Sequence, residues 1–386
     1  MNINKPNDNK NMGQIDYGIF YTLCILLSIG VIMVYSASSF YAMFHNNDSM
    51  YFFKRQLIWA IIGIISMSIM MSIDYHKLKK ITPQLLICTI PLLIAVFFFP
   101  AINGAKRWIS LGPLSFQPSE LTKYAVVLFL AFSIDLKGDE IKDFWHGLVP
   151  YLGLSGFFAA LILAEHNMSI ATIIMIVTFI MLFVAGGRIK HLFGIILPSL
   201  FTLAIFFIFS SDYRRERMLN FIDPWKDAAD AGYQLIQSFL ALGSGGLTGV
   251  GLGQSRQKTL YMPEPHNDFI FSIIGEEVGL IGCLFIIALF LIFIWRGVRV
   301  AMNAKDTYGK LLAMGITSII AVQAIINIAV VTGSMPVTGV PMPFISYGGT
   351  SLVINLTAMG ILLNISSQVE KKIVSFWIRA SSFRSS

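Results

Sequence analysis

Long apolar runs alternate with short polar segments along almost the whole chain. Ten of these runs approach the roughly 17–25 residues that an α-helix needs to cross the hydrocarbon core of a membrane. The runs are continuous and do not alternate between apolar and polar positions, so they predict helices and not the strands of a β-barrel. The expected spans are residues 17–36, 55–73, 84–100, 119–134, 147–164, 169–185, 192–209, 268–295, 310–332 and 350–366.

The composition agrees with this pattern. Hydrophobic residues make up 55% of the chain and charged residues 13%, about half the charged share of an ordinary soluble domain. The sequence therefore predicts an all-α, multi-span integral membrane protein. A net charge of +7, spread over several loops, predicts contact with membrane lipids and not with nucleic acid. The three cysteines lie inside apolar runs and are interpreted as core thiols.

Lys and Arg residues indicate the orientation of the spans. They gather in the short segments 74–80, 186–191 and 296–310, which we therefore expect in the cytoplasm. Both termini then lie on the same side, as a polar tail over 1–16 and a basic tail over 367–386, flanking a membrane domain over 17–366. The long loop over about 210–267 and the loops 104–120 and 333–349 fall on the extracytoplasmic side.

Asp268 stands where the polar, glycine-rich stretch that begins at Gly243 meets an apolar run. A carboxylate at such a boundary can cap a helix, form a salt bridge or act as a catalytic base. A helix N-terminus would lower its pKa, whereas the apolar residues 269–271 would raise it. The glycines lack the following Gly-Lys-Ser/Thr of a nucleotide-binding loop. Spacing alone leaves the cap and the base open.

Other charged residues fall within or beside the apolar runs. Glu120 and Lys123 are three residues apart on one helical face, which favours an internal ion pair over a cationic wall for an anionic headgroup. Glu276 and Glu277 lie deeper in the expected eighth span. Carboxylates inside a membrane are costly and usually paired, so we expect a structural role for both, with a cation on another span.

Several long motifs occur in a characteristic order: GAKRWISLG and QPSELTK within 104–123, FIDPW and GYQLIQS within 221–238, and GSGGLTGVGLGQSRQK at 243–258. PEPHNDFIFSIIGEEVG at 263–279 and PVTGVPMPFISYGG at 336–349 complete the set. Together they resemble the SEDS family (shape, elongation, division and sporulation) of peptidoglycan glycosyltransferases, and the FtsW/SpoVE branch more than the RodA branch. The chain departs from the family pattern at 165–169, where Glu-His-Asn-Met-Ser replaces Glu/Gln-Pro-Asp-hydrophobic-Gly, and at Asn267, which is often Thr.

The resemblance implies a protein of the bacterial plasma membrane with an outward-facing active site that polymerises lipid II during growth, division or sporulation. Asp268 would be the general base of an inverting displacement that forms a β-1,4 bond and releases undecaprenyl diphosphate. Because diphosphate is a good leaving group, cationic side chains or a divalent cation, Mg or Mn, can replace a general acid, and no organic cofactor is expected. The substrate-binding candidates are Lys106, Arg107, Lys123, Arg214, Arg215, Arg256, Lys258, His266 and Ser346.

The same resemblance implies a partner, a class B penicillin-binding protein that cross-links the glycan strands. Two other functions are compatible with the sequence: a lipid II flippase, and a non-catalytic membrane scaffold for the cross-linking enzyme. An inverted internal repeat would favour transport, and the order of the motifs contains none.

Overall fold

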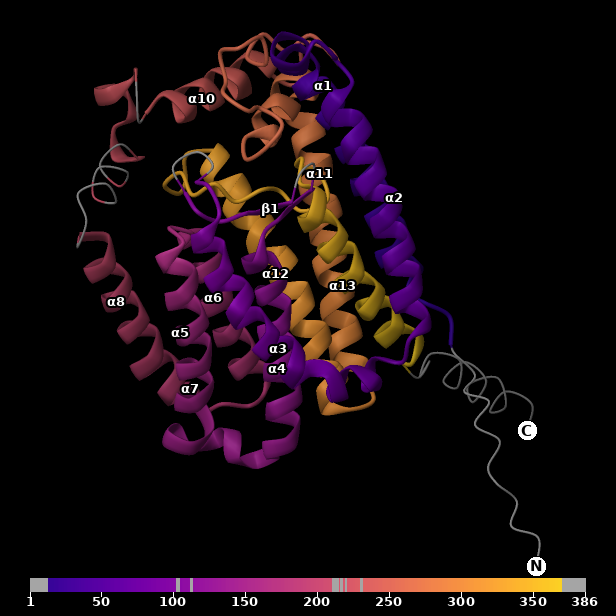
Figure 1. The fold of residues 1–386 in the computed structure, drawn as a ribbon, viewed down its shortest axis with the longest axis vertical. Helices are drawn as coiled ribbons and strands as arrows, with labels where there is room; N and C mark the ends of the chain where they lie inside the picture. Colours follow the sequence, from indigo (N-terminus) through magenta and orange to yellow (C-terminus); the bar gives the residue numbers. More distant parts are fainter. Residues whose placement is uncertain are drawn as a thin grey trace, which may run out of the picture.

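The computed structural model describes residues 13–101, 105–111, 114–209, 215, 218, 221–229 and 232–369. The long helices stand side by side as a bundle, with α10 and its neighbouring loops at one end (Figure 1). The elements are α1 Tyr17–Asn46, α2 Tyr51–Ser72, η1 Tyr75–Lys77, α3 Leu78–Ala95, η2 Val96–Phe98, β1 Ile109–Leu111, β2 Leu114–Phe116, α4 Pro118–Lys137, η3 Gly138–Lys142, η4 Phe144–Leu148, α5 Val149–Ala164, α6 Met168–Val184, α7 Ile189–His191, η5 Leu192–Ile196, α8 Leu197–Phe209, η6 Pro224–Asp227, α10 Tyr233–Gly245, α11 Ile270–Asn303, α12 Thr307–Val331 and α13 Gly349–Ser367.

Within the described part of the chain, seven helical segments are long and apolar enough to cross a membrane. They are α1, α2, α3 with its flanking turns, α5 with η4, α11, α12 and α13. Helix α6 and the segment Ile189–Leu203 are apolar but shorter. Helix α4 is not among the seven and carries several charged residues. The prediction of a multi-span helical membrane protein is confirmed in this coarser form.

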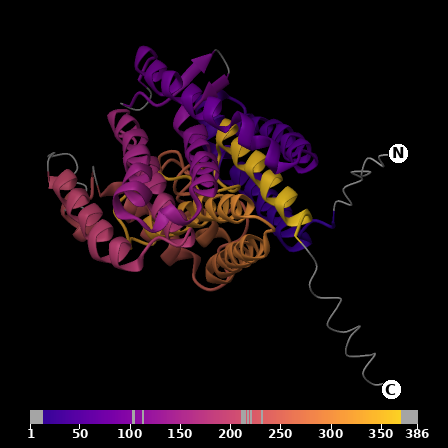
Figure 2. The ribbon, with the colours of Figure 1, turned by 90° about the horizontal axis from the view of Figure 1, so that it is seen from below.

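Helix α12 occupies the interior of the bundle, where it contacts α4, α6 and α11. Buried apolar residues occur around its whole circumference, as expected for a helix enclosed by other helices. Helix α13 packs along α2 (Figure 2). Helix α1 packs along α11. Helix α2 turns a row of isoleucines outward, including Ile58, Ile61 and Ile65, as expected for a face in contact with lipid.

The structure differs from the predicted pattern most clearly in two helix ends and in one loop. Helix α1 continues to Asn46, ten residues beyond its expected end, and α11 continues to Asn303. The segment expected as a loop over 104–120 contains an antiparallel hairpin in which Ile109 pairs with Phe116. Three-residue strands are too short to produce an alternating sequence pattern, so the apolar and polar positions alone did not predict them.

Helix α11 is interrupted at Gly279, whose φ of 71° and ψ of −170° are not helical. The glycine-rich loop 245–251 packs against the interruption, and a Cβ atom at Gly279 would lie 2.4 Å from the backbone nitrogen of Gly249. Backbone groups freed by the interruption thus gain partners from the loop, as they must in a membrane-spanning helix. The four bonds run from Val250 N to Glu276 O (2.9 Å), Gly251 N to Glu277 O (3.0 Å), Leu280 N to Gly246 O (3.0 Å) and Ile281 N to Leu247 O (3.1 Å).

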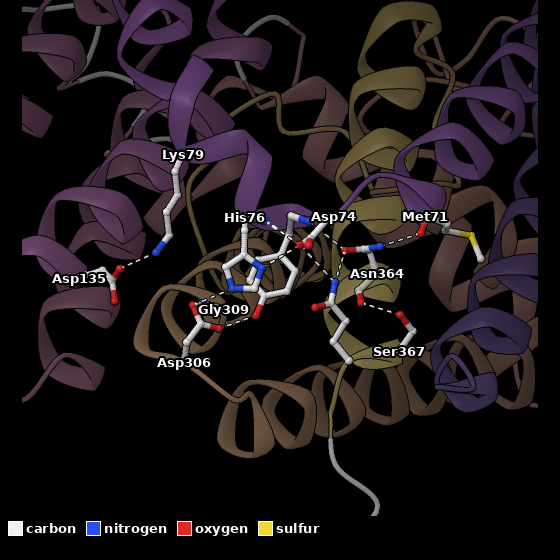
Figure 3. A network of polar contacts seen from close by, with 11 residues as sticks. Met71, Asp74, His76, Lys79, Asp135, Asp306, Gly309, Asn364 and Ser367 are labelled. Carbon is white, nitrogen blue, oxygen red and sulfur yellow. Dashed lines mark hydrogen bonds and ion pairs between the residues drawn. The ribbon is translucent and has the colours of Figure 1, made fainter. Parts of the chain in front are cut away.

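A polar network ties the elements together at the opposite end of the bundle (Figure 3). The hydroxyl of Tyr75 donates to Asp306, the N-cap residue of α12, and the backbone nitrogen of Tyr75 donates to Asn364 Oδ1 of α13 at 3.0 Å. Lys79 of α3 forms an ion pair with Asp135 of α4 at 2.7 Å. This end of the protein therefore holds α3, α4, α12 and α13 in fixed register.

Candidate functional site

The backbone around Asp268 is fixed by helix α12 and by the loop that precedes α13. Asn327 of α12 donates through Nδ2 to the carbonyl of Asp268 and to that of Val340, both at 2.7 Å. The hydroxyl of Ser346 donates to the carbonyl of Asn267 at 2.8 Å. Ser346, a predicted substrate-binding residue, is only 5% exposed. Its bond to Asn267 fixes the backbone next to Asp268.

The Asp268 carboxylate is half-buried and lies against Gly339, where a Cβ atom would come within 3.2 Å of Oδ2. Because Gly339 has a φ of 67°, the backbone favours glycine there, and its missing side chain leaves room beside the carboxylate. Desolvation and the negative charge of Glu264 raise the pKa of Asp268 to about 6, while Arg107 acts in the opposite direction. A carboxylate with this pKa is ionised at neutral pH and more basic than an ordinary aspartate.

The cap hypothesis for Asp268 is wrong. Helix α11 begins at Ile270 and its N-cap residue is Phe269, where the described residues provide no side-chain cap bond. The carbonyl of Phe269 accepts from Ser272 N at 3.0 Å, so the first turn closes one residue after Asp268. Stabilisation of the Asp268 anion by the helix N-terminus, which would have lowered its pKa, does not prevail over desolvation.

Arg107 is the predicted cation that acts on Asp268. Its guanidinium donates to the carbonyl of His166, in the turn between α5 and α6, and its charge lowers the pKa of Asp268. The neighbouring Lys106 is exposed and donates instead to the carbonyl of Phe97 at 3.0 Å. Of the two adjacent cations, Arg107 is therefore the one that faces the aspartate.

Glu165 belongs to the same cluster, although the sequence did not single it out as a site residue. It ends α5, is 0% exposed, and neither of its carboxylate oxygens has a hydrogen-bond partner among the described residues. Burial raises the pKa of Glu165 to about 8, and Arg107 opposes that rise. A signal was present in the sequence, since Glu165 directly follows an apolar run just as Asp268 directly precedes one.

Glu264 and Asn267 complete the surroundings of Asp268. Glu264 has a φ of 46°, unusual for a residue other than glycine, and accepts a hydrogen bond from Asn267 Nδ2 at 2.8 Å. The backbone conformation and this bond place the Glu264 charge where it raises the pKa of Asp268. The side-chain amide of Asn267, where the family often has Thr, thus helps to hold residues 264–267 in position through its bond to Glu264.

Lys123 forms the internal ion pair with Glu120. Its Nζ lies 3.0 Å from Glu120 Oε2, and the side chains are 0% and 2% exposed, respectively. Ser351 of α13 donates to the same Glu120 oxygen at 2.7 Å. Lys123 is buried and its charge is paired with Glu120, so in the described structure it does not form an open cationic wall. Glu120, through its bond from Ser351, links α4 to α13.

Lys258 is also paired. Its Nζ donates to Glu277 Oε1 at 2.7 Å, and Ser36 of α1 donates to both oxygens of the same carboxylate. Glu276 accepts from Ser255 Oγ at 2.5 Å and from Arg256 N at 2.9 Å. We expected a cation on another span for both glutamates. The partners instead come mainly from the loop before α11, because the interruption at Gly279 brings that loop against the helix.

Arg256 is exposed beside a groove of about 830 Å³ between α1 and residues 252–259. Residues of α1 such as Ile32, Phe40 and Met43 line one side of the groove, and Lys258 lies on the other. Asp268 and Arg107 are not among the described residues that line it. Arg256 and Lys258 therefore belong to a different part of the surface from the Asp268 cluster.

His266 lies in an aromatic cage and not at an open binding surface. Its ring centroid is 4.2 Å from that of Phe52 and 5.6 Å from those of Tyr41 and Tyr347. Burial lowers the pKa of His266 to about 3, so the ring is neutral and offers no charge to a diphosphate. Arg215 is exposed, and Arg214 lies outside the described residues.

The described residues do not form a metal site by themselves. Among the residues whose positions are described, no group of three or more His, Cys, Asp or Glu side chains could hold a metal ion. Mg²⁺ is commonly held by substrate phosphates together with one or two carboxylates. A divalent cation would therefore reach the described part of the site as a companion of a phosphate-bearing substrate.

The fold and site define a multi-span helical membrane protein with an acid–arginine cluster at one end of its bundle. Residues 17–371 match the family model FTSW_RODA_SPOVE, described as "Cell cycle protein". The chain belongs to this family, which confirms the resemblance inferred from the motifs.

Individual relatives agree with this assignment. The chain is 44% identical to "Probable peptidoglycan glycosyltransferase FtsW" of Geobacter sp. (strain M18), over 89% of this chain and 95% of the relative. It is also 44% identical to "Stage V sporulation protein E" of Bacillus subtilis (strain 168), over 89% and 94%. A chain from the structure "Structural coordination of polymerization and crosslinking by a peptidoglycan synthase complex" is 26% identical, with a TM-score of 0.77 over 93% of this chain and 99% of the other.

Proposed function

We propose that this protein is a peptidoglycan glycosyltransferase that polymerises lipid II into β-1,4-linked glycan strands. Relatives that match along nearly their whole length carry this activity in their names. The observation on which the proposal depends is the position of Asp268, a carboxylate with a pKa of about 6 held beside Arg107 at the edge of the membrane domain.

In the proposed reaction, Asp268 removes the proton from the acceptor 4-hydroxyl while that oxygen attacks the anomeric carbon of the donor sugar. The bond from that carbon to the diphosphate breaks on the opposite face, so the configuration inverts. Arg107 stabilises the charge that develops on the departing undecaprenyl diphosphate. Lys123 and Lys258 are each paired with a buried glutamate, so they support the reaction by stabilising the fold.

Reconstitution with purified lipid II tests the function. We expect the purified protein to convert lipid II into glycan polymers that a gel resolves by length. A flippase would instead move lipid II across a sealed vesicle without forming polymer, and a scaffold would do neither. The absence of polymer, with a well-folded protein and a cross-linking partner present, would contradict the glycosyltransferase proposal.

We further propose ten spans with both termini in the cytoplasm of a bacterial cell, which places the Asp268 cluster outside the plasma membrane. Helix α4, helix α6 and the segment formed by α7, η5 and α8 would then be spans in addition to the seven long apolar segments described above. The distribution of Lys and Arg supports this arrangement. A class B penicillin-binding protein is the proposed partner, as the synthase complex among the structural neighbours suggests.

Cysteine labelling tests the orientation. A single cysteine placed at Leu252, which is 65% exposed, should react with a membrane-impermeant thiol reagent in intact cells. A matched cysteine at Asp139, in the turn after α4, should react only after the cells are opened. The native cysteines are first replaced by serine. Labelling at Asp139 in intact cells with protection at Leu252 would invert the proposed orientation.

A further inference from the structure

Glu165 is a buried carboxylate that the proposed reaction does not use. It is 0% exposed, and its two oxygens have no hydrogen-bond partner among the described residues. By contrast, the similarly buried Glu120, Glu276 and Glu277 all have partners. A buried polar group without a partner costs free energy, so a position that keeps one calls for a functional explanation.

The surroundings of Glu165 point to an anionic ligand. Arg107 donates to the carbonyl of His166, the next residue, so its guanidinium is anchored beside Glu165. The same guanidinium acts electrostatically on both Glu165 and Asp268. Arg107 thus connects the proposed base with the unpartnered carboxylate, and a diphosphate bound to Arg107 would lie within the same cluster.

We propose that Glu165 binds the diphosphate of the donor as a neutral carboxylic acid, donating its proton in a hydrogen bond to a diphosphate oxygen beside Arg107. The inference rests on the proposed function, because it names a residue for the leaving group of that reaction. A neutral acid adds a donor without adding negative charge next to an anion. The bond would strengthen as charge develops on the diphosphate, which makes it useful for catalysis.

The protonation state agrees with this role. Burial raises the pKa of Glu165 to about 8, which keeps the group neutral at pH 7. Among the described residues, Arg107 is the charged group that acts on Glu165, and His166 follows Glu165 in the same turn. Helix α4, which contacts α5, carries the closed Glu120–Lys123 pair, and Arg107 also acts on Asp268, whose pKa Glu264 raises. Helix α12 also packs against α6, but its charged residue, Lys310, lies at the other end of the bundle.

The test measures the binding of undecaprenyl diphosphate in detergent micelles between pH 7 and pH 9.5. We expect wild-type affinity to fall as the pH rises through about 8, because Glu165 then ionises beside the ligand. Glu165→Gln keeps a neutral donor at every pH, so its affinity should stay within about threefold of wild type at pH 7 and should not fall at high pH. Glu165→Ala should bind about ten- to a hundredfold more weakly at pH 7.

Different outcomes separate the inference from the proposed function. Equal loss of binding in Glu165→Gln and Glu165→Ala, both folded by a thermal-unfolding check, would overturn the neutral-donor role, because a neutral amide donor at this position would then contribute nothing to binding. A wild-type affinity that does not change with pH would also overturn it. If wild-type protein binds the diphosphate with the expected pH dependence but forms no polymer from lipid II, the Glu165 subsite stands and the glycosyltransferase function fails.

Discussion

Asp268→Asn should reduce glycan polymerisation by roughly a hundred- to ten-thousand-fold, the contribution typical of a general base. The amide has nearly the shape of the carboxylate but cannot accept a proton at neutral pH. The backbone contacts from Asn327 and Ser346 do not involve the replaced atoms, so the fold should persist. Lipid II binding should also persist, because the diphosphate is assigned to Arg107 and Glu165.

The measurement is polymer yield from purified protein and lipid II, with thermal unfolding recorded for each variant. Asp48→Asn is the matched control, because this carboxylate lies at the surface in the loop between α1 and α2, where it pairs with the exposed Lys54 and accepts from Met50 N. Wild-type activity should also decline as the pH falls below about 6, where Asp268 becomes protonated. Near-normal polymer from a folded Asp268→Asn protein would exclude Asp268 as the base.

Lys258→Met should destabilise the protein by about 3–5 kcal/mol, since it leaves Glu277 as a buried charge without its cation. The two side chains are 7% and 0% exposed and lie 2.7 Å apart. Replacing both partners, as Lys258→Met with Glu277→Gln, should recover much of the loss because no unpaired charge remains. The double variant therefore distinguishes a structural pair from a lysine that binds substrate.

Thermal unfolding in detergent, together with lipid II affinity, provides the measurement. Lys54→Met is the control, because the Lys54–Asp48 pair is 60% and 40% exposed and surface pairs contribute little. A Lys258→Met protein that unfolds like wild type but requires much more lipid II would contradict the structural assignment and restore Lys258 as a substrate-binding residue.

The apolar runs predicted the helices because burial from water imposes a pattern that extends over many residues. Contacts between distant segments leave no such local pattern. The sequence shows Glu276, Glu277, Lys258 and Arg256 near one another, yet which charges meet depends on how the loop packs against α11. Glu165 went unrecognised for the same reason, since its burial and its proximity to Arg107 arise only when α5 meets the segment before β1.

Asp268 illustrates the opposite case. Its position at the boundary of an apolar run indicated a special role, and the family motif favoured the base over the cap. The choice between them depended on where α11 begins, which differs by two residues from the predicted start. Helix ends are set by local backbone contacts, here the bond from Ser272 to Phe269, and hydropathy does not resolve them.

The interruption of α11 also has a consequence for how the protein is made. A nascent helix that enters the bilayer with a gap at Gly279 would expose unpaired backbone groups to hydrocarbon. Loop 245–251, which satisfies those groups, precedes α11 in the chain and so is synthesised first. We therefore expect the break at Gly279 to form together with the docking of this loop, so that the final shape of the span is set when loop and helix meet.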